Sequence, residues 1–262
     1  MNLLFVGDVV GKPGRRALAA NLASLVDKHS ADYVVVNIEN AAGGFGVTPS
    51  VFEELADLPV DCFTTGNHVW DKREVREVLQ AEPRLLRPAN YPEGAPGSGL
   101  YVGESAGGVK VATINLEGRV FMKTLECPFR TADRQLAALD DDVKVVLVDF
   151  HAEATSEKLA LGFYLDGRVS LVVGTHTHVP TADERVLPQG SAYQTDAGMT
   201  GPYESIIGMK ADKVIERFLS QRPSGFEVAK KDIRLAGCLV SVDPVSGKAT
   251  SIERIMVHDA LA

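Results

Sequence analysis

Short apolar runs rich in valine and isoleucine recur along this chain, and patterns typical of helices lie between them. The runs predict strands at Asn2–Val9, Asp32–Asn40, Asp61–His68, Val109–Gly118, Val143–His151 and Val169–His178. Runs that are apolar almost throughout are typical of strands buried on both faces of a sheet. Gly14–His29 carries apolar residues at helical spacing, and Thr48 followed by Pro49 predicts the start of another helix. This alternation predicts a layered α/β fold.

Two segments depart from the alternation. Cys238–Val257 predicts two strands joined by the turn-rich stretch DPVSGK, which indicates a hairpin and therefore a mixed sheet. Arg119–Leu139 has scattered apolar residues and a proline. We expect this segment, near residues 119–139, to be a small insertion or cap over a functional site.

Length and charge limit the classes of function. A chain of 262 residues with 45% hydrophobic residues can bury a sizeable core, so we expect one domain spanning residues 1–262. The net charge of -8 argues against a surface that grips long nucleic acid. It leaves open a small phosphate-bearing substrate whose charge is neutralised by bound cations.

The cysteines and the N-terminus indicate the compartment. Cys62, Cys127 and Cys238 are far apart and show no C-x-x-C spacing, so neither a disulfide framework nor a thiolate zinc site is indicated. The opening run lacks a basic segment and is interrupted by Asp8, and no later run is long enough to span a bilayer. We therefore expect a soluble cytoplasmic protein with no membrane partner.

The stretch SLVVGTHTHVPT places His176 and His178 one residue apart at the end of an apolar run. If the strand continues through them, both imidazoles lie on one face, because alternate side chains of a strand share a face. Such a pair suits a metal ion. Histidines near strand ends are also often only hydrogen-bonded, so this stretch alone leaves both interpretations open.

Polar residues also follow the other predicted strands. Asp8 closes the first strand, Glu39 and Asn40 the second, Asn67 and His68 the third, and His151 the fifth. Each has a local explanation as a helix cap, a turn former or a satisfied imidazole. Ligands of open α/β sheets bind at the carboxyl ends of the strands, however, and all these residues fall there. Their joint placement predicts one site.

The residue types at this site suit one chemistry. Carboxylate oxygens, amide oxygens and neutral imidazoles are ligands for divalent iron, manganese or zinc. The candidate ligands are too many for one catalytic ion, so two ions that share Glu39 as a bridge are the economical assignment. The glycines at positions 7, 11 and 14 match neither a dinucleotide-binding fingerprint nor a P-loop. The stretch AAGGFG, residues 41–46, is either a turn or a source of backbone N–H groups for a phosphate.

These motifs resemble those of the calcineurin-like metallophosphoesterases, and more closely those of the YmdB-type branch. The resemblance covers nearly the whole chain, through FVGDVVGKPGR, NIENAAGGFG, TTGNHVWDKRE, RPANYP, GTHTHVPTAD and YQTDAGMTGPYESIIG. It implies a layered metallophosphoesterase-like sandwich of mixed β-sheets flanked by helices. The superfamily pattern Asp-x-His is broken here by Val10, and the second motif offers Glu39 and Asn40 where an aspartate is usual.

The resemblance also assigns roles to the candidate residues. It implies that one ion is bound by Asp8 and His178, with Asn40 filling the position left by Val10. A second ion is then bound by Asn67, His151 and His176, with Glu39 bridging the two. His68 is expected near the leaving oxygen as a general acid or transition-state donor. Asp71 and Arg73 either orient that region or begin a solvated helix, and Thr195 or Ser205 are expected near the ions.

The resemblance implies a phosphodiesterase with two divalent or mixed-valence ions, Fe or Mn, with Zn as the alternative. Its substrates are expected to be cyclic nucleotides, 2′,3′-cyclic ones favoured, hydrolysed by attack of a metal-bridging hydroxide. A general phosphomonoesterase or nucleotidase is one alternative. Another is a regulatory protein whose metal site senses a ligand with little turnover. The sequence leaves the native metal and the oligomeric state open, including a homo-oligomer.

Overall fold

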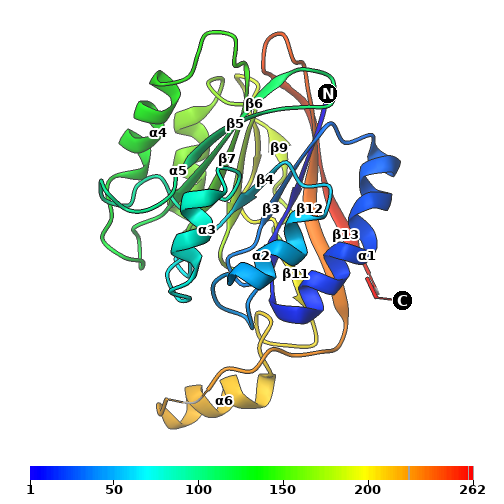
Figure 1. The fold of residues 1–262 in the computed structure, drawn as a ribbon, viewed down its shortest axis with the longest axis vertical. Coiled ribbons are helices and arrows are strands. Elements are labelled where there is room, and N and C mark those ends of the chain that lie inside the picture. Colours follow the sequence, from blue (N-terminus) through cyan, green and yellow to red (C-terminus); the bar gives the residue numbers. More distant parts are fainter. Residues whose placement is uncertain (224, 259, 262) are drawn as a thin grey trace.

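Two mixed β-sheets pack face to face, and helices cover their outer faces (Figure 1). The coordinates are a computed structural model, and they describe residues 1–223, 225–258 and 260–261. The layered α/β sandwich expected from the sequence is therefore the observed fold. No helix of the described residues is both long enough and apolar enough to cross a membrane.

The first sheet is seven-stranded and contains the first and the last strand of the described residues. Its order is β2-β11-β12-β1-β3-β4, with β13 paired to β12. Strands β1, β3 and β4 are parallel, whereas β12 runs antiparallel to β1 and to β13. The strands are β1 (Asn2–Val6), β2 (Asp8–Val9), β3 (Tyr33–Asn37), β4 (Cys62–Thr64), β11 (Met199–Pro202), β12 (Ile233–Val242) and β13 (Ala249–Val257). The last two form the hairpin that the sequence predicts.

The second sheet is six-stranded, in the order β5-β6-β7-β8-β10-β9. Strands β6, β7, β8 and β10 are parallel, and β5 and β9 pair antiparallel at the two edges. The strands are β5 (Leu100–Glu104), β6 (Lys110–Glu117), β7 (Val145–His151), β8 (Leu171–Thr175), β9 (Arg185–Val186) and β10 (Ala192–Gln194).

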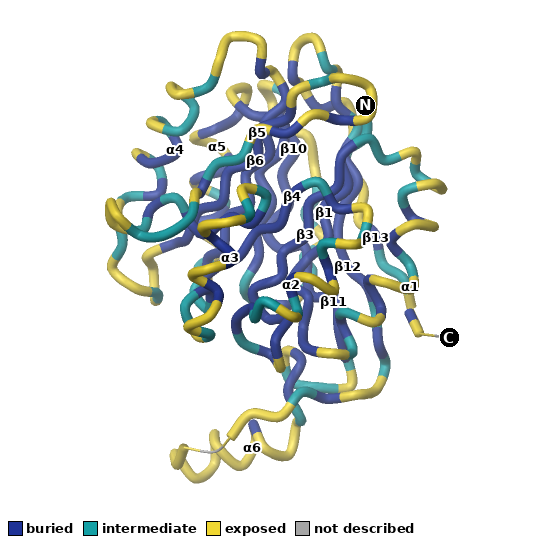
Figure 2. The backbone as a smooth tube through the Cα atoms, in the orientation of Figure 1, coloured by how far each residue is buried: buried dark blue, intermediate teal, exposed yellow. Residues whose placement is uncertain are grey.

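Alternation along the strands explains why they are apolar on both faces. In β1, Leu3 and Phe5 lie in the core between the sheets, whereas Leu4 and Val6 face the helices outside. Because both faces are covered, no polar alternation is required. Figure 2 shows the resulting buried interior, with most exposed residues in the helices, the connecting loops and the edge strands.

Helices pack on the outer face of each sheet. α1 (Gly11–His29), α2 (Pro49–Ala56) and α3 (Val75–Ala81) share a core with the first sheet, while α4 (Pro128–Ala137) and α5 (Thr155–Leu165) cover the second. The predicted cap of α2 is confirmed, since the Thr48 hydroxyl accepts from the N–H of Val51 at 3.4 Å and Pro49 begins the helix.

One helix stands apart from the sandwich. α6 (Ala211–Ser220) projects from one end of the molecule and is exposed along most of its length (Figures 1 and 2). Of its residues only Val214 is buried, in a small apolar cluster with Val10, Met199 and Met209. The segment 119–139, which the sequence predicts to be a cap, forms a loop and α4, and α4 packs against β6. From this segment, the Lys123 ammonium donates to the carbonyl of Asn67 at 3.3 Å.

Candidate metal centre

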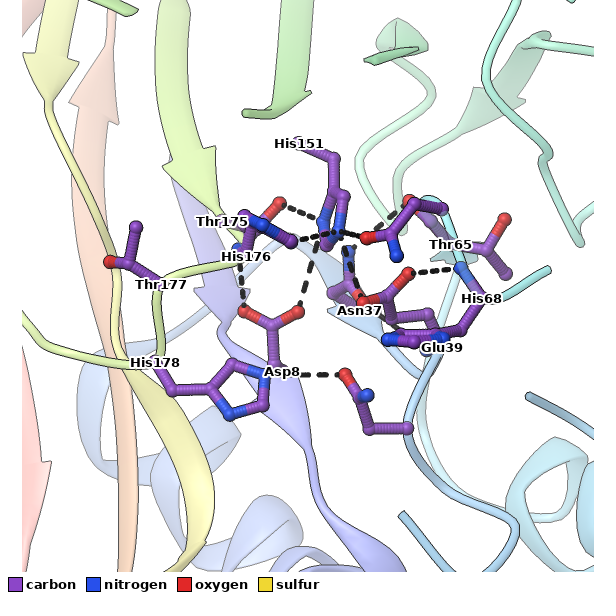
Figure 3. A network of polar contacts seen from close by, with 12 residues as sticks. Asp8, Asn37, Glu39, Thr65, His68, His151, Thr175, His176, Thr177 and His178 are labelled. Atoms are coloured by element: carbon purple, nitrogen blue, oxygen red, sulfur yellow. Dashed lines mark hydrogen bonds and ion pairs between the residues drawn. The ribbon is translucent and has the colours of Figure 1, made fainter. Parts of the chain in front are cut away.

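Seven polar side chains meet where strands of both sheets end, and we refer to them together as the polar cluster. Its members are Asp8, Glu39, Asn40, Asn67, His151, His176 and His178 (Figure 3). Glu39, Asn40 and Asn67 follow parallel strands of the first sheet, and Asp8 follows β1 directly. The three histidines come from the ends of β7 and β8 in the second sheet. The predicted convergence of these residues is therefore observed, and it joins both sheets.

The prediction that His176 and His178 share one face of a strand is wrong. β8 ends at Thr175, and both histidines have positive φ angles, 98° and 65°. Their backbone is therefore a left-handed turn rather than an extended strand, and the two rings go to different neighbours. His176 Nδ1 lies 3.0 Å from His151 Nε2, whereas His178 Nε2 lies 3.3 Å from Asn40 Oδ1.

His151 stands at the centre of the first group of contacts. Its Nε2 lies 3.0 Å from Glu39 Oε1, 2.8 Å from Asn67 Oδ1 and 3.0 Å from His176 Nδ1. Ligand atoms of Glu39, His151 and His176 all lie within 4.8 Å of one another. These atoms are oxygen and nitrogen acceptors brought together in the interior, which is the arrangement that a cation stabilises.

Hydrogen bonds behind His151 determine which ring nitrogen faces the cluster. The Thr175 hydroxyl donates to Asp149 Oδ1 at 2.7 Å and lies 2.9 Å from His151 Nδ1. Because this hydroxyl has one proton, its oxygen must accept from Nδ1–H. Nε2 is then the nitrogen directed at Glu39 and Asn67, where it donates to Glu39 in the metal-free protein and would offer its lone pair to a cation. Such outer hydrogen bonds orient metal-binding histidines in proteins generally.

In the second group of contacts, outer hydrogen bonds also determine which atoms face each other. His178 Nδ1 donates to the carbonyl of Ile207 at 2.9 Å, and Asn40 Nδ2 donates to the carbonyl of Gly44 at 2.9 Å. His178 Nε2 and Asn40 Oδ1 are therefore both acceptors that face each other. Nearby, Asp8 Oδ2 accepts from the N–H of His176 at 3.2 Å, and Asp8 Oδ1 is buried without a hydrogen bond. The donor set and this orphaned oxygen fit a second cation.

The electrostatics of the cluster reflect this concentration of acceptors. Burial raises the pKa of Asp8 to about 6, although His178 and His151 oppose the shift. Burial would also raise the pKa of Glu39, but attraction and a hydrogen bond from His151 outweigh it and lower that pKa to about 2. For His151, burial favours the neutral ring, yet Glu39 and Asp8 raise its pKa to about 9. A proton on His151 thus balances part of the negative charge of the carboxylates.

His68 lies beside the cluster rather than within it. Its backbone N–H donates to Glu39 Oε2 at 3.1 Å, and its ring Nδ1 is 2.8 Å from Asp71 Oδ2. The ring is partly exposed and packs edge-on against Phe45, with the centroids 4.9 Å apart. Asp71 therefore orients the His68 ring. This contact favours the orienting role of Asp71 over its interpretation as the start of a solvated helix. Arg73 is exposed.

A glycine allows the two sheets to approach here. A Cβ at Gly66, in the GNH motif, would lie 2.2 Å from Cδ2 of the His151 ring. That separation is far inside van der Waals contact, so a side chain at position 66 would displace His151.

A cavity of about 630 Å³ opens beside the polar cluster. One part of its wall is formed by Glu39, His68, His176 and His178, and another by α6 and the residues around it. Its volume is within the usual range for small-molecule sites. The cluster is therefore accessible to a ligand from one side.

Two buried networks that support the histidines are not evident from the sequence. Asp149 in β7 accepts from the side chains of Thr64, Asn37 and Thr175. Asp149 lies within an apolar strand, so the strand pattern does not mark it as a site residue. The signal that could have identified it is a carboxylate within an otherwise apolar run. The second network pairs the buried Lys158 of α5 with Asp196, at 2.7 Å.

Other residues that the sequence places near a phosphate or the ions form hydrogen bonds outside the polar cluster. Within residues 41–46, the N–H groups of Ala41, Ala42 and Gly44 bond to carbonyls of the same turn, which favours the turn interpretation. Thr195 bonds to Asp183 and Tyr193, and the Ser205 hydroxyl bonds to backbone groups of its own loop. Neither contacts the polar cluster through these bonds.

Comparisons with known proteins agree with this architecture. The family described as YmdB-like protein matches residues 4–255. The chain is 48% identical to the 2′,3′-cyclic-nucleotide 2′-phosphodiesterase of Bacillus subtilis, over 99% of this chain and 98% of that protein. It is 38% identical to a putative phosphatase/phosphodiesterase of Mycoplasma pneumoniae, over 98% and 93% of the two chains.

Solved structures give the same result. A hypothetical protein from Thermus thermophilus superposes with a TM-score of 0.93 at 43% identity, over 98% of this chain and 99% of that one. A novel phosphatase from Mycoplasma pneumoniae superposes with a TM-score of 0.92 at 37% identity, over 98% and 93%.

Proposed function

The chain belongs to the YmdB-like family, and we propose that it is a metal-dependent phosphodiesterase that hydrolyses cyclic nucleotides. The observation that carries the proposal is the group formed by Glu39, His151 and His176, of which Glu39 and His176 line a cavity. Acceptors so close together need cations, and cations at a cavity wall attract a phosphate. The relative from Bacillus subtilis, named as a 2′,3′-cyclic-nucleotide phosphodiesterase, supports that class of substrate.

Two divalent ions fit the donors of the polar cluster. The separate contacts of His176 and His178 support a division into two sites. In this proposal Asp8, Asn40 and His178 would hold one ion, Asn67, His151 and His176 would hold the other, and Glu39 would contribute its charge to both. Oxygen and imidazole donors without thiolate favour iron or manganese, with zinc as the alternative. When bound, the ions would polarise the phosphate and lower the pKa of a water molecule.

His68 is the group proposed to act on the leaving oxygen. Asp71 accepts from its Nδ1–H, so Nε2 is the nitrogen left for a substrate in the cavity. With both ring nitrogens protonated, His68 would donate the Nε2 proton to the departing ribose oxygen, which is a poor leaving group without one. The backbone N–H of His68 also holds Glu39, so one short segment positions both groups.

A phosphomonoesterase is the second candidate. The Mycoplasma pneumoniae relative is named as a putative phosphatase/phosphodiesterase, which leaves monoesters as substrates. The two functions predict different products from the same assay. A phosphodiesterase opens a cyclic nucleotide to a monophosphate and stops, whereas a phosphomonoesterase leaves the cyclic nucleotide intact and releases inorganic phosphate from 3′-AMP.

The test is a substrate panel with controlled metal. Protein stripped with a chelator is reloaded with Mn²⁺ or Fe²⁺ and given 2′,3′-cAMP, 3′,5′-cAMP and 3′-AMP, with products separated by chromatography. We expect the fastest turnover with 2′,3′-cAMP, and none in chelator. His29→Ala is the matched control, because this histidine lies outside the polar cluster, near Glu253 at 3.7 Å. Absence of turnover on every substrate with either metal would refute the proposal.

A further inference from the structure

A row of ring side chains extends from the polar cluster toward α6. The Phe45 ring lies 4.9 Å from His68 and 5.8 Å from Phe226, measured between centroids. The Arg217 guanidinium lies 4.9 Å from the centroid of the Phe226 ring. All four side chains belong to the wall of the cavity, and only His68 has a role in the proposed reaction.

The far end of this row is exposed although it is apolar. Phe226 is 43% exposed, and Phe218, also in the cavity wall, is 71% exposed. Large apolar side chains gathered at the wall of a cavity commonly mark a ligand surface. Val214 of α6 and Phe45 both pack in the apolar cluster of Val10, Met199 and Met209, which connects this end of the cavity wall to the body of the protein.

The charges of the cavity are divided between its two ends. Glu39 and the histidines lie at the end proposed to hold cations, and a phosphate would be bound there. Arg217 is the one lysine or arginine among the described residues of the wall, and its planar cation is stacked on Phe226. Arginine planes and aromatic rings are the groups on which proteins stack nucleobases.

We propose that Phe45, Phe226 and Arg217 form a stacking surface for the nucleobase of the substrate, while its cyclic phosphate lies at the polar cluster. This inference rests on the proposed phosphodiesterase function and adds the residues that determine how the base is bound. Because every base has a π face, stacking of this kind tolerates all four bases. We expect purines to bind more tightly than pyrimidines, since their larger rings cover more of the surface.

The test compares substrates with and without a base. kcat and KM are measured for 2′,3′-cAMP and for methyl riboside 2′,3′-cyclic phosphate, with wild type, Phe226→Leu and Arg217→Met. Phe226→Leu keeps an apolar side chain but removes the ring. We expect KM for 2′,3′-cAMP to rise about 5- to 100-fold, the range for losing one base-stacking contact, with the change in KM rather than kcat. For the base-free substrate, kcat and KM should be the same in wild type and in both variants.

Two further variants isolate the ring. Phe226→Tyr, which keeps it, should retain more affinity for 2′,3′-cAMP than Phe226→Leu. Leu219→Ala is the matched control on α6, because Leu219 is 82% exposed and does not belong to the cavity wall. Its KM should equal that of wild type.

A binding measurement separates this inference from the proposed function. Calorimetry of metal-loaded protein with 3′-AMP and with ribose 3-phosphate needs no turnover, and wild type should bind 3′-AMP more tightly. Failure to hydrolyse any cyclic nucleotide would refute the function alone. Equal binding of the two ligands, or equal losses on both substrates in Phe226→Leu, would overturn the stacking surface. A changed oligomeric state with unchanged KM would also overturn it, and would assign α6 to an interface between copies of this chain.

Discussion

Asp196 connects the turn that carries His176 and His178 to the interior of the second sheet. Its Oδ2 accepts from Lys158 Nζ at 2.7 Å, and from the N–H and hydroxyl of Thr177 at 3.2 and 2.7 Å. Its Oδ1 accepts from the N–H of Gly198 at 2.8 Å. Thr177 lies between the two histidines, so Asp196 holds the segment that places both rings.

Replacing Asp196 with alanine should be costly for a specific reason. The side chains of Lys158 and Asp196 are each 1% exposed, so the substitution leaves an ammonium group buried without a counter-charge. Breaking a buried ion pair in this way typically costs about 3–5 kcal/mol. Replacing Lys158 with methionine as well removes the buried charge, and the double variant should regain about 1–2 kcal/mol, with the lost bonds to Thr177 and Gly198 still destabilising it.

The assay is urea unfolding of the metal-free protein followed by circular dichroism, together with metal content after reloading. Asp196→Ala should also retain fewer ions per chain, because the turn between the histidines is released. Asp133→Ala is the matched control: its carboxylate pairs with Arg168 at 2.7 Å on the surface, and its loss should cost about 1 kcal/mol or less. A cost below about 1 kcal/mol for Asp196→Ala, or a double variant no more stable than the single one, would refute this reasoning.

Three further predictions concern the polar cluster. Glu39→Gln keeps the size of the side chain but removes the charge proposed to neutralise two ions, so turnover should fall by orders of magnitude while the circular dichroism spectrum is retained; near-normal turnover with two bound metals would contradict the bridge. His68→Ala should lower turnover of 2′,3′-cAMP about 100-fold or more, and that of an aryl phosphodiester clearly less, with metal content unchanged. Equal losses on the two substrates would indicate charge stabilisation instead, and loss of metal would make His68 a ligand. In the metal-free protein, the pKa of His151 is raised from 6.5 to about 9, so its contribution to stability is fully present below pH 6.5 and is lost as the pH rises through 9. The melting temperature should therefore fall over that interval, and a His151→Gln variant with the same slope would contradict the assignment.

Much of the scaffold is predictable from the sequence because it depends on local patterns. The strand beginning at Asn2 and the helix beginning at Pro49 follow from runs of apolar residues and from a capping residue, which act within one element. The first predicted strand is divided in the structure, since β1 ends at Val6 and β2 begins at Asp8. The predicted assignment of residues 119–139 as a cap and of the chain as one domain stays a prediction.

Local patterns predict the residues of the candidate site but not their backbone geometry. A polar residue at the end of most predicted strands is visible in the sequence, and parallel strands bring such residues to one edge of a sheet. The sequence therefore determined which side chains are candidates for the site. It did not reveal the positive φ angles at His176 and His178, where the backbone N–H groups of His176 and Thr177 donate to the distant carboxylates of Asp8 and Asp196.

The tertiary structure alone decided how these side chains divide. Two sheets meet face to face, so Glu39 from one can lie 3.0 Å from His151 of the other, although the residues are far apart in the chain. The same packing buries Lys158 beside Asp196 and places α6 at the wall of the cavity. Each of these pairings depends on which surfaces exclude water together. That is a property of the packed layers, and no single stretch of sequence contains it.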